Sequence, residues 1–100
     1  QAARALIENE SNWVRRYYAA DADGAALAPF DRRATRFCAI GACRRVTGHS
    51  AADQASEIPE LDDAADKLFS ATVVNVNDGR SHFDVLAMFD YAISIAKDSP

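Results

Sequence analysis

Phe37-Cys-Ala-Ile-Gly-Ala-Cys43 is the longest apolar run in the sequence, and it decides the fold that we expect. The run is apolar on every side of a helix, which is typical of an element surrounded by others, so we predict a buried central helix from Asp31 to Val46. Gly41 costs about 1 kcal/mol relative to Ala inside a helix, a cost that is tolerable where another backbone packs closely over it. The run is far shorter than the about 20 residues needed to cross a bilayer, so we expect no membrane segment.

The sequence before this helix predicts one more helical region and a turn. Apolar positions from Ala3 to Tyr17 fit one helical stripe, and the cap-like residues Asn9 to Asn12 predict a bend or a division into two short helices. The second of these would carry Trp13, Tyr17 and Tyr18. Asp23-Gly24 is a strong turn signal that allows a small β-hairpin.

The sequence after the central helix predicts two further helices and a short strand. Thr47 to Ser56 is small and polar and is typical of a surface loop, and a helix is expected from Pro59 to about Phe69. The β-branched stretch Thr72 to Val76 predicts a strand that ends in a turn at Asn77-Asp-Gly79. Ser81 is a good N-cap for a last helix.

Length and composition indicate one compact domain. The chain has 100 residues, of which 49% are hydrophobic and 26% charged, with a net charge of −4. We therefore predict a mainly α single domain over residues 1–100, with α+β as the alternative. It would have four or five helices around the central one and at most a short β-hairpin. The acidic balance argues against a dedicated nucleic-acid binder, since proteins of that class are strongly basic.

The two cysteines argue against a disulfide and against a metal site. Cys38 and Cys43 lie five positions apart in a segment expected to be helical, at about 8 to 9 Å between Cα atoms, which is too far for a bridge. Their spacing does not match structural zinc pairs, and His49 and His82 are not spaced as a finger pair. We expect no metal, no cofactor and a cytoplasmic location, because residues 1–7 also lack the pattern of a signal peptide.

One constellation contains the residue types of a cysteine-dependent enzyme. Cys38 could act as nucleophile, His82 as base, and Asp78 or Asn77 as the group that orients the base. Two features count against it: burial of Cys38 would raise the pKa of the thiol, and a histidine beside an N-cap is biased toward its neutral form. We therefore assign no catalytic residue, and keep a cysteine-dependent hydrolase or transferase as an alternative.

The charges are distributed unevenly along the chain. Residues 1–50 carry eight arginines against five acids, and residues 51–100 carry three basic groups against ten acids. The plainer interpretation is that these charges balance across the fold. The alternative is a basic face that binds a phosphate, a nucleic acid or an acidic partner. On the predicted helix Arg33, Arg36 and Arg44 share one side, and Arg15 and Arg16 would join them.

A set of residues spread over nearly the whole chain carries a resemblance to a known family. The set comprises Trp13, the Asp23-Gly24 turn, Phe37-Cys-Ala-Ile-Gly-Ala42, Val74-Asn-Val-Asn-Asp78, His82, Val85, Leu86, Phe89, Asp90, Ala92 and Ile93. Through them the chain resembles a family of small uncharacterised bacterial and phage proteins, a domain of unknown function of about the same length. Val14 and Arg15 after the tryptophan, and a shortened turn before His82, depart from that pattern. The resemblance implies no established activity. It implies a bacterial or phage setting, in which very small proteins often bind a host protein.

These observations favour a non-enzymatic protein-interaction module, of the kind a phage could use to modulate a host factor. We expect its partner to be another protein, with no role for a membrane. Self-association through exposed aromatic residues is the further alternative, and its candidates are Tyr17, Tyr18 and Phe30.

Overall fold

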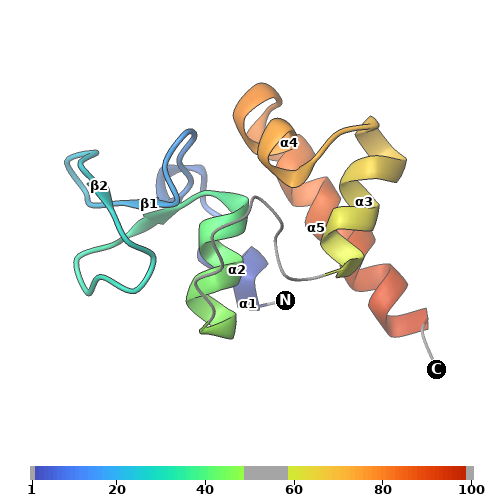
Figure 1. Cartoon of the computed structure of the whole chain (residues 1–100), viewed down its shortest axis with the longest axis horizontal. Coiled ribbons are helices and arrows are strands. Elements are labelled where there is room, and N and C mark those ends of the chain that lie inside the picture. Colours follow the sequence, from blue (N-terminus) through green and yellow to red (C-terminus); the bar gives the residue numbers. More distant parts are fainter. Residues whose placement is uncertain (1, 49–58, 99–100) are drawn as a thin grey trace.

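The run from Phe37 to Cys43 is buried along its whole length in the computed structural model, which describes residues 2–48 and 59–98. Helix α2 (Ala39–Thr47) contains most of this run and lies in the middle of the molecule (Figure 1). It begins with Cys38 as N-cap and ends at Gly48, whose backbone is left-handed. The predicted central helix is confirmed in position and burial.

The start of that helix was predicted wrongly. Asp31 lies in a turn, where its carboxylate accepts the backbone N–H of Arg33 at 2.9 Å, and β3 (Arg36–Phe37) follows. An aspartate that bonds its own backbone two residues on stabilises a turn in place of a helix. The strand then satisfies its backbone by pairing with β1, so the helix begins eight residues later than predicted, at Ala39.

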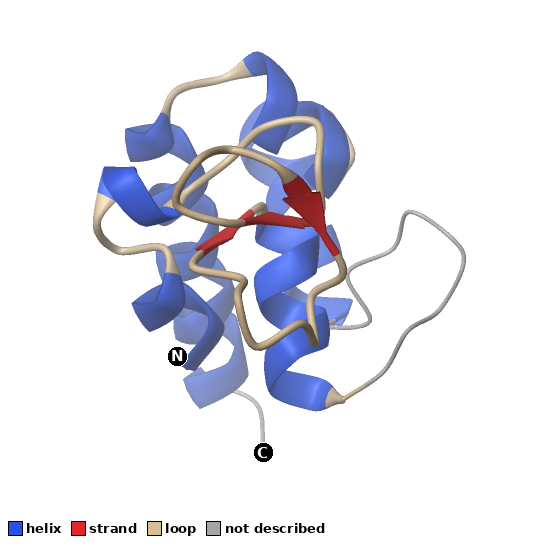
Figure 2. Cartoon of the chain, turned by 90° about the vertical axis from the view of Figure 1, so that its left-hand side faces the viewer, coloured by secondary structure: helices blue, strands red, loops and turns tan. Residues whose placement is uncertain are grey.

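A three-stranded antiparallel sheet of very short strands covers one side of the helices (Figure 2). Its order is β2-β1-β3, with β1 at Ala19–Ala20 and β2 at Ala26–Leu27. The Asp21 carboxylate accepts the N–H groups of Asp23 and Ala25, each at 2.9 Å, and so closes the turn between β1 and β2. The predicted hairpin is therefore confirmed, and β3 is an addition to it.

The N-terminal region contains less helix than predicted. Helix α1 (Ala2–Leu6) is followed by a single 3-10 turn, η1 (Glu10–Asn12), which Asn9 caps. Beyond η1 the chain is not helical: Trp13 forms an isolated parallel bridge with Phe37, and Val14 donates its N–H to the Phe37 carbonyl. The expected second helix is wrong, because pairing with β3 takes up the backbone of this segment.

Three helices form the C-terminal part: α3 (Pro59–Phe69), α4 (Val73–Gly79) and α5 (His82–Asp98). Helices α3 and α5 pack side by side, and α4 connects them at one end (Figure 1). Both predicted long helices are confirmed, and the Ser81 hydroxyl accepts the Asp84 N–H at 3.1 Å as a cap should. Most of the predicted loop Thr47 to Ser56 lies outside the described residues.

The predicted strand from Thr72 to Val76 is wrong, since this stretch belongs to α4. Thr72 caps the helix, and its hydroxyl accepts the Asn75 N–H at 3.2 Å. Val73, Val76 and Asn77 are buried at helical spacing of three and four positions. Packing of one helix face thus overrides the β preference of the valines.

Candidate functional site

A pocket of about 230 Å³ opens where three segments of the chain meet. The segment before β1 contributes Arg16, Tyr17 and Tyr18, the start of α2 contributes Cys38 and Ile40, and α4 contributes Val74, Asn77 and Asp78. We call this site the tyrosine pocket. Its residues come from three distant parts of the sequence, so only the fold brings them together.

Asn77 is the residue that holds these segments in place. Its side chain is 2% exposed, and its Oδ1 accepts the Trp13 Nε1–H at 2.6 Å and the Ala39 N–H at 2.9 Å. Its Nδ2 donates to the Val14 carbonyl and to an Asp78 carboxylate oxygen, each at 3.1 Å. All donors and acceptors of the buried amide are therefore used, as burial of a polar group requires.

Asp78 positions the mouth of the pocket. The same oxygen, Oδ1, accepts the backbone N–H of Arg16 at 2.9 Å. Arg16 has a φ of 75°, in the left-handed region that non-glycine residues seldom adopt. The hydrogen bond holds the backbone in this conformation, and the two tyrosines follow directly after it.

The two tyrosines are exposed, and Tyr18 is also held by contacts with α2. Tyr17 is 49% exposed and Tyr18 is 38% exposed. The buried Arg44 places its guanidinium carbon 4.5 Å from the centre of the Tyr18 ring. The Tyr18 carbonyl accepts the Cys38 N–H, which fixes this residue to the start of α2. The attraction between the Arg44 guanidinium and the face of the Tyr18 ring also helps to hold that side chain in place.

The Cys38 thiol is placed as a capping group and not as a nucleophile. Its Sγ accepts the Gly41 N–H at 3.2 Å, and it is almost fully buried. Burial raises the pKa of the Cys38 thiol, and the nearby Asp78 carboxylate raises that pKa further. Hydrogen bonds from Gly41 and Ile40 act in the opposite direction but are outweighed. A thiol kept in its neutral form is a poor nucleophile.

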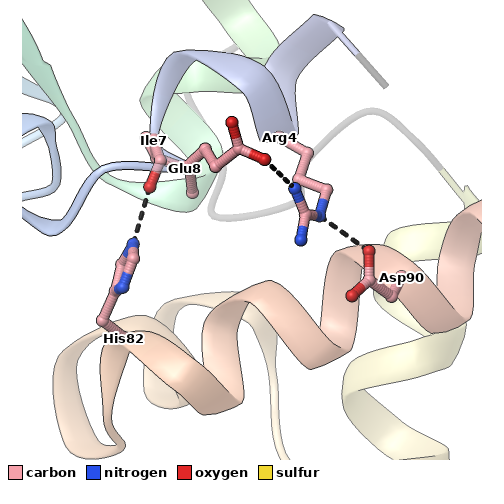
Figure 3. Close-up of polar contacts among 5 residues, drawn as sticks. All are labelled: Arg4, Ile7, Glu8, His82 and Asp90. Atoms are coloured by element: carbon pink, nitrogen blue, oxygen red, sulfur yellow. Dashed lines mark hydrogen bonds and ion pairs between the residues drawn. The ribbon is translucent and has the colours of Figure 1, made fainter.

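His82 lies at another contact, between α5 and the end of α1 (Figure 3). Its Nε2 lies 2.6 Å from the Ile7 carbonyl oxygen, and its ring centre lies 5.3 Å from that of Trp13. Further along α5, Arg4 bridges Glu8 and Asp90 (Figure 3). Within residues 2–48 and 59–98, no hydrogen bond joins His82 to Cys38. Of the predicted catalytic set, only Cys38, Asp78 and Asn77 share the pocket.

The five arginines predicted to bind do not lie on one helix. Arg33 pairs with Asp31, and Arg36 donates to the Ala22 carbonyl at 3.1 Å; both precede α2. Arg44 is on α2 but only 4% exposed. The helical wheel that grouped these three residues therefore does not apply, because the helix starts later. Arg16 lines the tyrosine pocket, whereas the Arg15 side chain lies against the Trp13 ring and donates to the Arg80 carbonyl.

Residues 2–48 and 59–98 hold no cluster of three His, Cys, Asp or Glu side chains placed for a metal. At the start of α2, the N–H groups of Ala39 and Gly41 are already bonded to Asn77 and Cys38, so this helix end is closed to an anion. None of the described helices combines the length and apolarity needed to span a membrane.

Comparison with known protein families assigns the chain to one of them. The model of DUF6197, a family of unknown function, matches residues 1–95. The chain belongs to this family. No curated protein and no solved structure gives a significant match. The resemblance seen in the sequence is confirmed, and the function of this DUF6197 member has to be argued from its own geometry.

Sequence reasoning missed the central role of Asn77 in this DUF6197 chain. The signal was present: an asparagine that follows Val73 and Val76 at helical spacing lies on the buried face of a helix. An amide on such a face needs several partners, which marks it as a connecting residue. The prediction of a strand for this stretch concealed that spacing.

Proposed function

We propose that this chain is a non-enzymatic protein-interaction module that binds its partner at the tyrosine pocket. The observation that carries the proposal is the pocket itself, with two exposed tyrosines at its mouth. Its volume of about 230 Å³ is below the roughly 300 to 1,000 Å³ of typical small-molecule sites. A pocket of this size suits one inserted side chain of a partner protein.

The composition of the mouth supports the same conclusion. Tyrosine and arginine are enriched among the residues that contribute most to protein–protein binding, and here Tyr17 and Tyr18 follow Arg15 and Arg16 directly. Tyrosine offers a large contact area at small cost in conformational entropy. The hydrogen bonds of Asn77 and Asp78 hold this segment in place before binding, which lowers the entropy lost on association.

The chemistry within the pocket supports binding over catalysis. Burial raises the pKa of the Cys38 thiol, and the imidazole of His82 is bonded to the Ile7 carbonyl, away from the pocket. Asp78 is bonded to Arg16 and Asn77. No described group is thus poised to activate the thiol as a nucleophile. Two buried thiols also fit a reducing compartment, and we propose that the module acts on a host factor in the cytoplasm.

Site-specific photocrosslinking in a bacterial lysate tests this proposal. A photoreactive phenylalanine analogue replaces Tyr17 in one variant and Phe30 in the control, because the two side chains have similar exposure, 49% and 45%. We expect one specific protein to crosslink at position 17 and not at position 30. Equal crosslinking at both positions, or none at either, would contradict the proposal.

A further inference from the structure

We propose that the tyrosine pocket receives a neutral aromatic side chain of the partner protein. This inference rests on the proposed function and names the chemical class of the inserted group. Three observations carry it: the size of the pocket, the rings in its wall, and the opposite charges of two residues that line it.

The pocket is large enough for an aromatic ring. Its volume is about 230 Å³, whereas an apolar cavity of about 150 Å³ can already bind benzene. A short aliphatic side chain, such as that of alanine or valine, would leave much of this space empty, and an unfilled wall loses van der Waals contacts. The size of the pocket therefore favours a ring.

The wall of the pocket also favours a ring. Tyr17 and Tyr18 line it together with the aliphatic residues Ile40 and Val74. Aromatic rings attract one another in offset and edge-to-face arrangements, beyond the gain from burial alone. The Asn77 amide lines the pocket too, but its four hydrogen bonds are all made within the protein, so it does not require a polar partner.

The charges at the pocket have opposite signs and favour a neutral group. Arg16 and Asp78 both line it, so an inserted charge of either sign would be attracted by one residue and repelled by the other. The Cys38 thiol inside the pocket responds to both signs: burial is the main cause of its raised pKa, Asp78 raises that pKa further, and Arg44 lowers it. A charged side chain would thus lose its hydration without a net electrostatic gain, whereas a neutral ring would gain from burial.

A nucleobase is also a neutral aromatic ring, and the structure favours it less. The phosphate attached to it would meet Asp78 as well as Arg16 at the pocket. The backbone N–H groups of Ala39 and Gly41 at the start of α2 are occupied, so a phosphate would find no cradle of amides there. The net charge of −4 also opposes the approach of a polyanion. An aromatic side chain of a protein brings no such charge.

Titration of the isotopically labelled full chain with capped pentapeptides, followed by NMR, tests the inference. The probe is Ser-Gly-Phe-Gly-Ser, and the three comparison peptides carry Leu, Glu or Lys in place of Phe. We expect the probe to shift the amide signals of Ile40 and Val74. The Leu peptide should bind at least about threefold more weakly, and the two charged peptides at least about tenfold more weakly.

Two pairs of variants locate the site. Val74→Phe should abolish the shift at Ile40 by filling the pocket, whereas Val46→Phe, at an exposed valine of α2 outside the pocket, should leave binding unchanged. Tyr17→Leu removes a ring but keeps an apolar side chain, so it should reduce the preference for the Phe peptide over the Leu peptide at least about twofold. Phe30→Leu is its control, because Phe30 and Tyr17 have similar exposure, and it should preserve that preference. The spectrum of each variant reports whether it is folded.

A Leu peptide that binds as tightly as the probe would overturn the aromatic assignment, and a charged peptide that binds more tightly would overturn the neutral one. The absence of any shift at Ile40 and Val74 would overturn the inference as a whole. Shifts at these amides with a single-stranded oligonucleotide but not with the probe would assign the site to nucleic acid instead. If the probe fails while a protein still crosslinks at position 17, the aromatic side chain is wrong and the proposed function stands. If crosslinking also fails, the inference and the proposed function are both wrong.

Discussion

Arg16 has a left-handed backbone conformation, which is strained for a residue other than glycine. A left-handed conformation costs a residue other than glycine about 1 to 2 kcal/mol. Here the cost is offset by the hydrogen bond from the Arg16 N–H to Asp78, while the guanidinium extends to the mouth of the pocket without an ion pair. Strain of this kind tends to persist at functional sites. The proposed function would give the Arg16 side chain a binding role that a glycine could not fill.

Replacing Arg16 with glycine should therefore separate stability from binding. The variant relieves the strain but gives the unfolded chain more freedom, so the free energy of unfolding should stay unchanged or rise by up to about 1 kcal/mol. Crosslinking of the partner from a neighbouring position should weaken. Urea denaturation and the photocrosslinking assay measure the two effects.

Ser70 provides the matched control for that comparison. It has a φ of 51° at the end of α3, where its own N–H donates to the Asp66 carbonyl at 2.8 Å, in the pattern that usually has glycine at this position. Like Arg16→Gly, Ser70→Gly should leave the free energy of unfolding unchanged or raise it slightly. Unlike Arg16→Gly, it should leave partner binding intact. Loss of binding in both variants would show that Arg16 has no special role.

Asn77 should be among the least replaceable residues. In Asn77→Ala the Trp13 Nε1–H and the Ala39 N–H lose their acceptor in a buried site, which should lower the free energy of unfolding by about 3 kcal/mol or more. Asn75 is an exposed asparagine on the same helix, and Asn75→Ala should change that free energy by less than about 0.5 kcal/mol. Equal effects in a urea titration would refute the connecting role of Asn77.

At the scale of elements, the position of α2 depends on close contact with another backbone. A methyl group added at Gly41 would lie 1.7 Å from the Tyr18 carbonyl oxygen. The glycine thus allows the segment with the two tyrosines to pack directly on the first turns of α2. The sequence predicted this close approach, although it could not predict which backbone was involved.

The substitution Gly41→Ala should destabilise the fold, although Ala normally stabilises a helix interior by about 1 kcal/mol. The clash is with backbone atoms that cannot move aside easily, so we expect a loss of at least about 2 kcal/mol. Gly79, near the end of α4, has nothing within 4 Å of an added methyl group, and Gly79→Ala is the control. It should be neutral or slightly stabilising. Thermal and urea denaturation would show whether the two variants differ in this direction.

At the scale of the whole molecule, Cys38 and Cys43 are buried thiols in the core between the sheet and the C-terminal helices. A thiol reagent should therefore reach them only when the protein opens. We expect iodoacetamide labelling at pH 7 to be slow in the native protein and rapid in urea. Asn77→Ala should speed native labelling in proportion to its loss of stability. Rapid labelling of Cys38 in the native protein would restore the cysteine-dependent enzyme as an alternative.

The raised pKa of the Cys38 thiol also predicts a dependence of stability on pH. An unfolded thiol titrates near pH 8.5, whereas the buried thiol holds its proton to higher pH. Above about pH 8.5 the unfolded state binds fewer protons than the native state, so stability falls as pH rises through the pKa of the folded state. Between pH 8 and pH 10 the wild type should lose more stability than Cys38→Ser. Identical pH profiles under reducing conditions would contradict this.

The charge difference between the two halves of the chain was expected to contribute little stability, because exposed ion pairs are weak. One ion pair, between Arg4 and Asp90, joins the halves among the described residues, and it is partly exposed, so it adds little stability. The buried apolar core, the Asn77 amide and the contact of His82 with Ile7 join them instead. Among the described residues Arg15 and Arg16 form no ion pair, and Arg15 donates to the Arg80 carbonyl.

The sequence by itself determined the buried central run, the long helices α3 and α5, the hairpin turn and the membership of DUF6197. Each of these depends on local spacing, capping or composition, which neighbouring residues carry. Only the tertiary structure decided where α2 begins and that Arg16, Tyr18, Cys38 and Asp78 share one pocket. Those outcomes depend on backbone pairing and on burial between segments up to 64 positions apart, as in the bond from Trp13 to Asn77. Such contacts leave no periodic pattern in the chain.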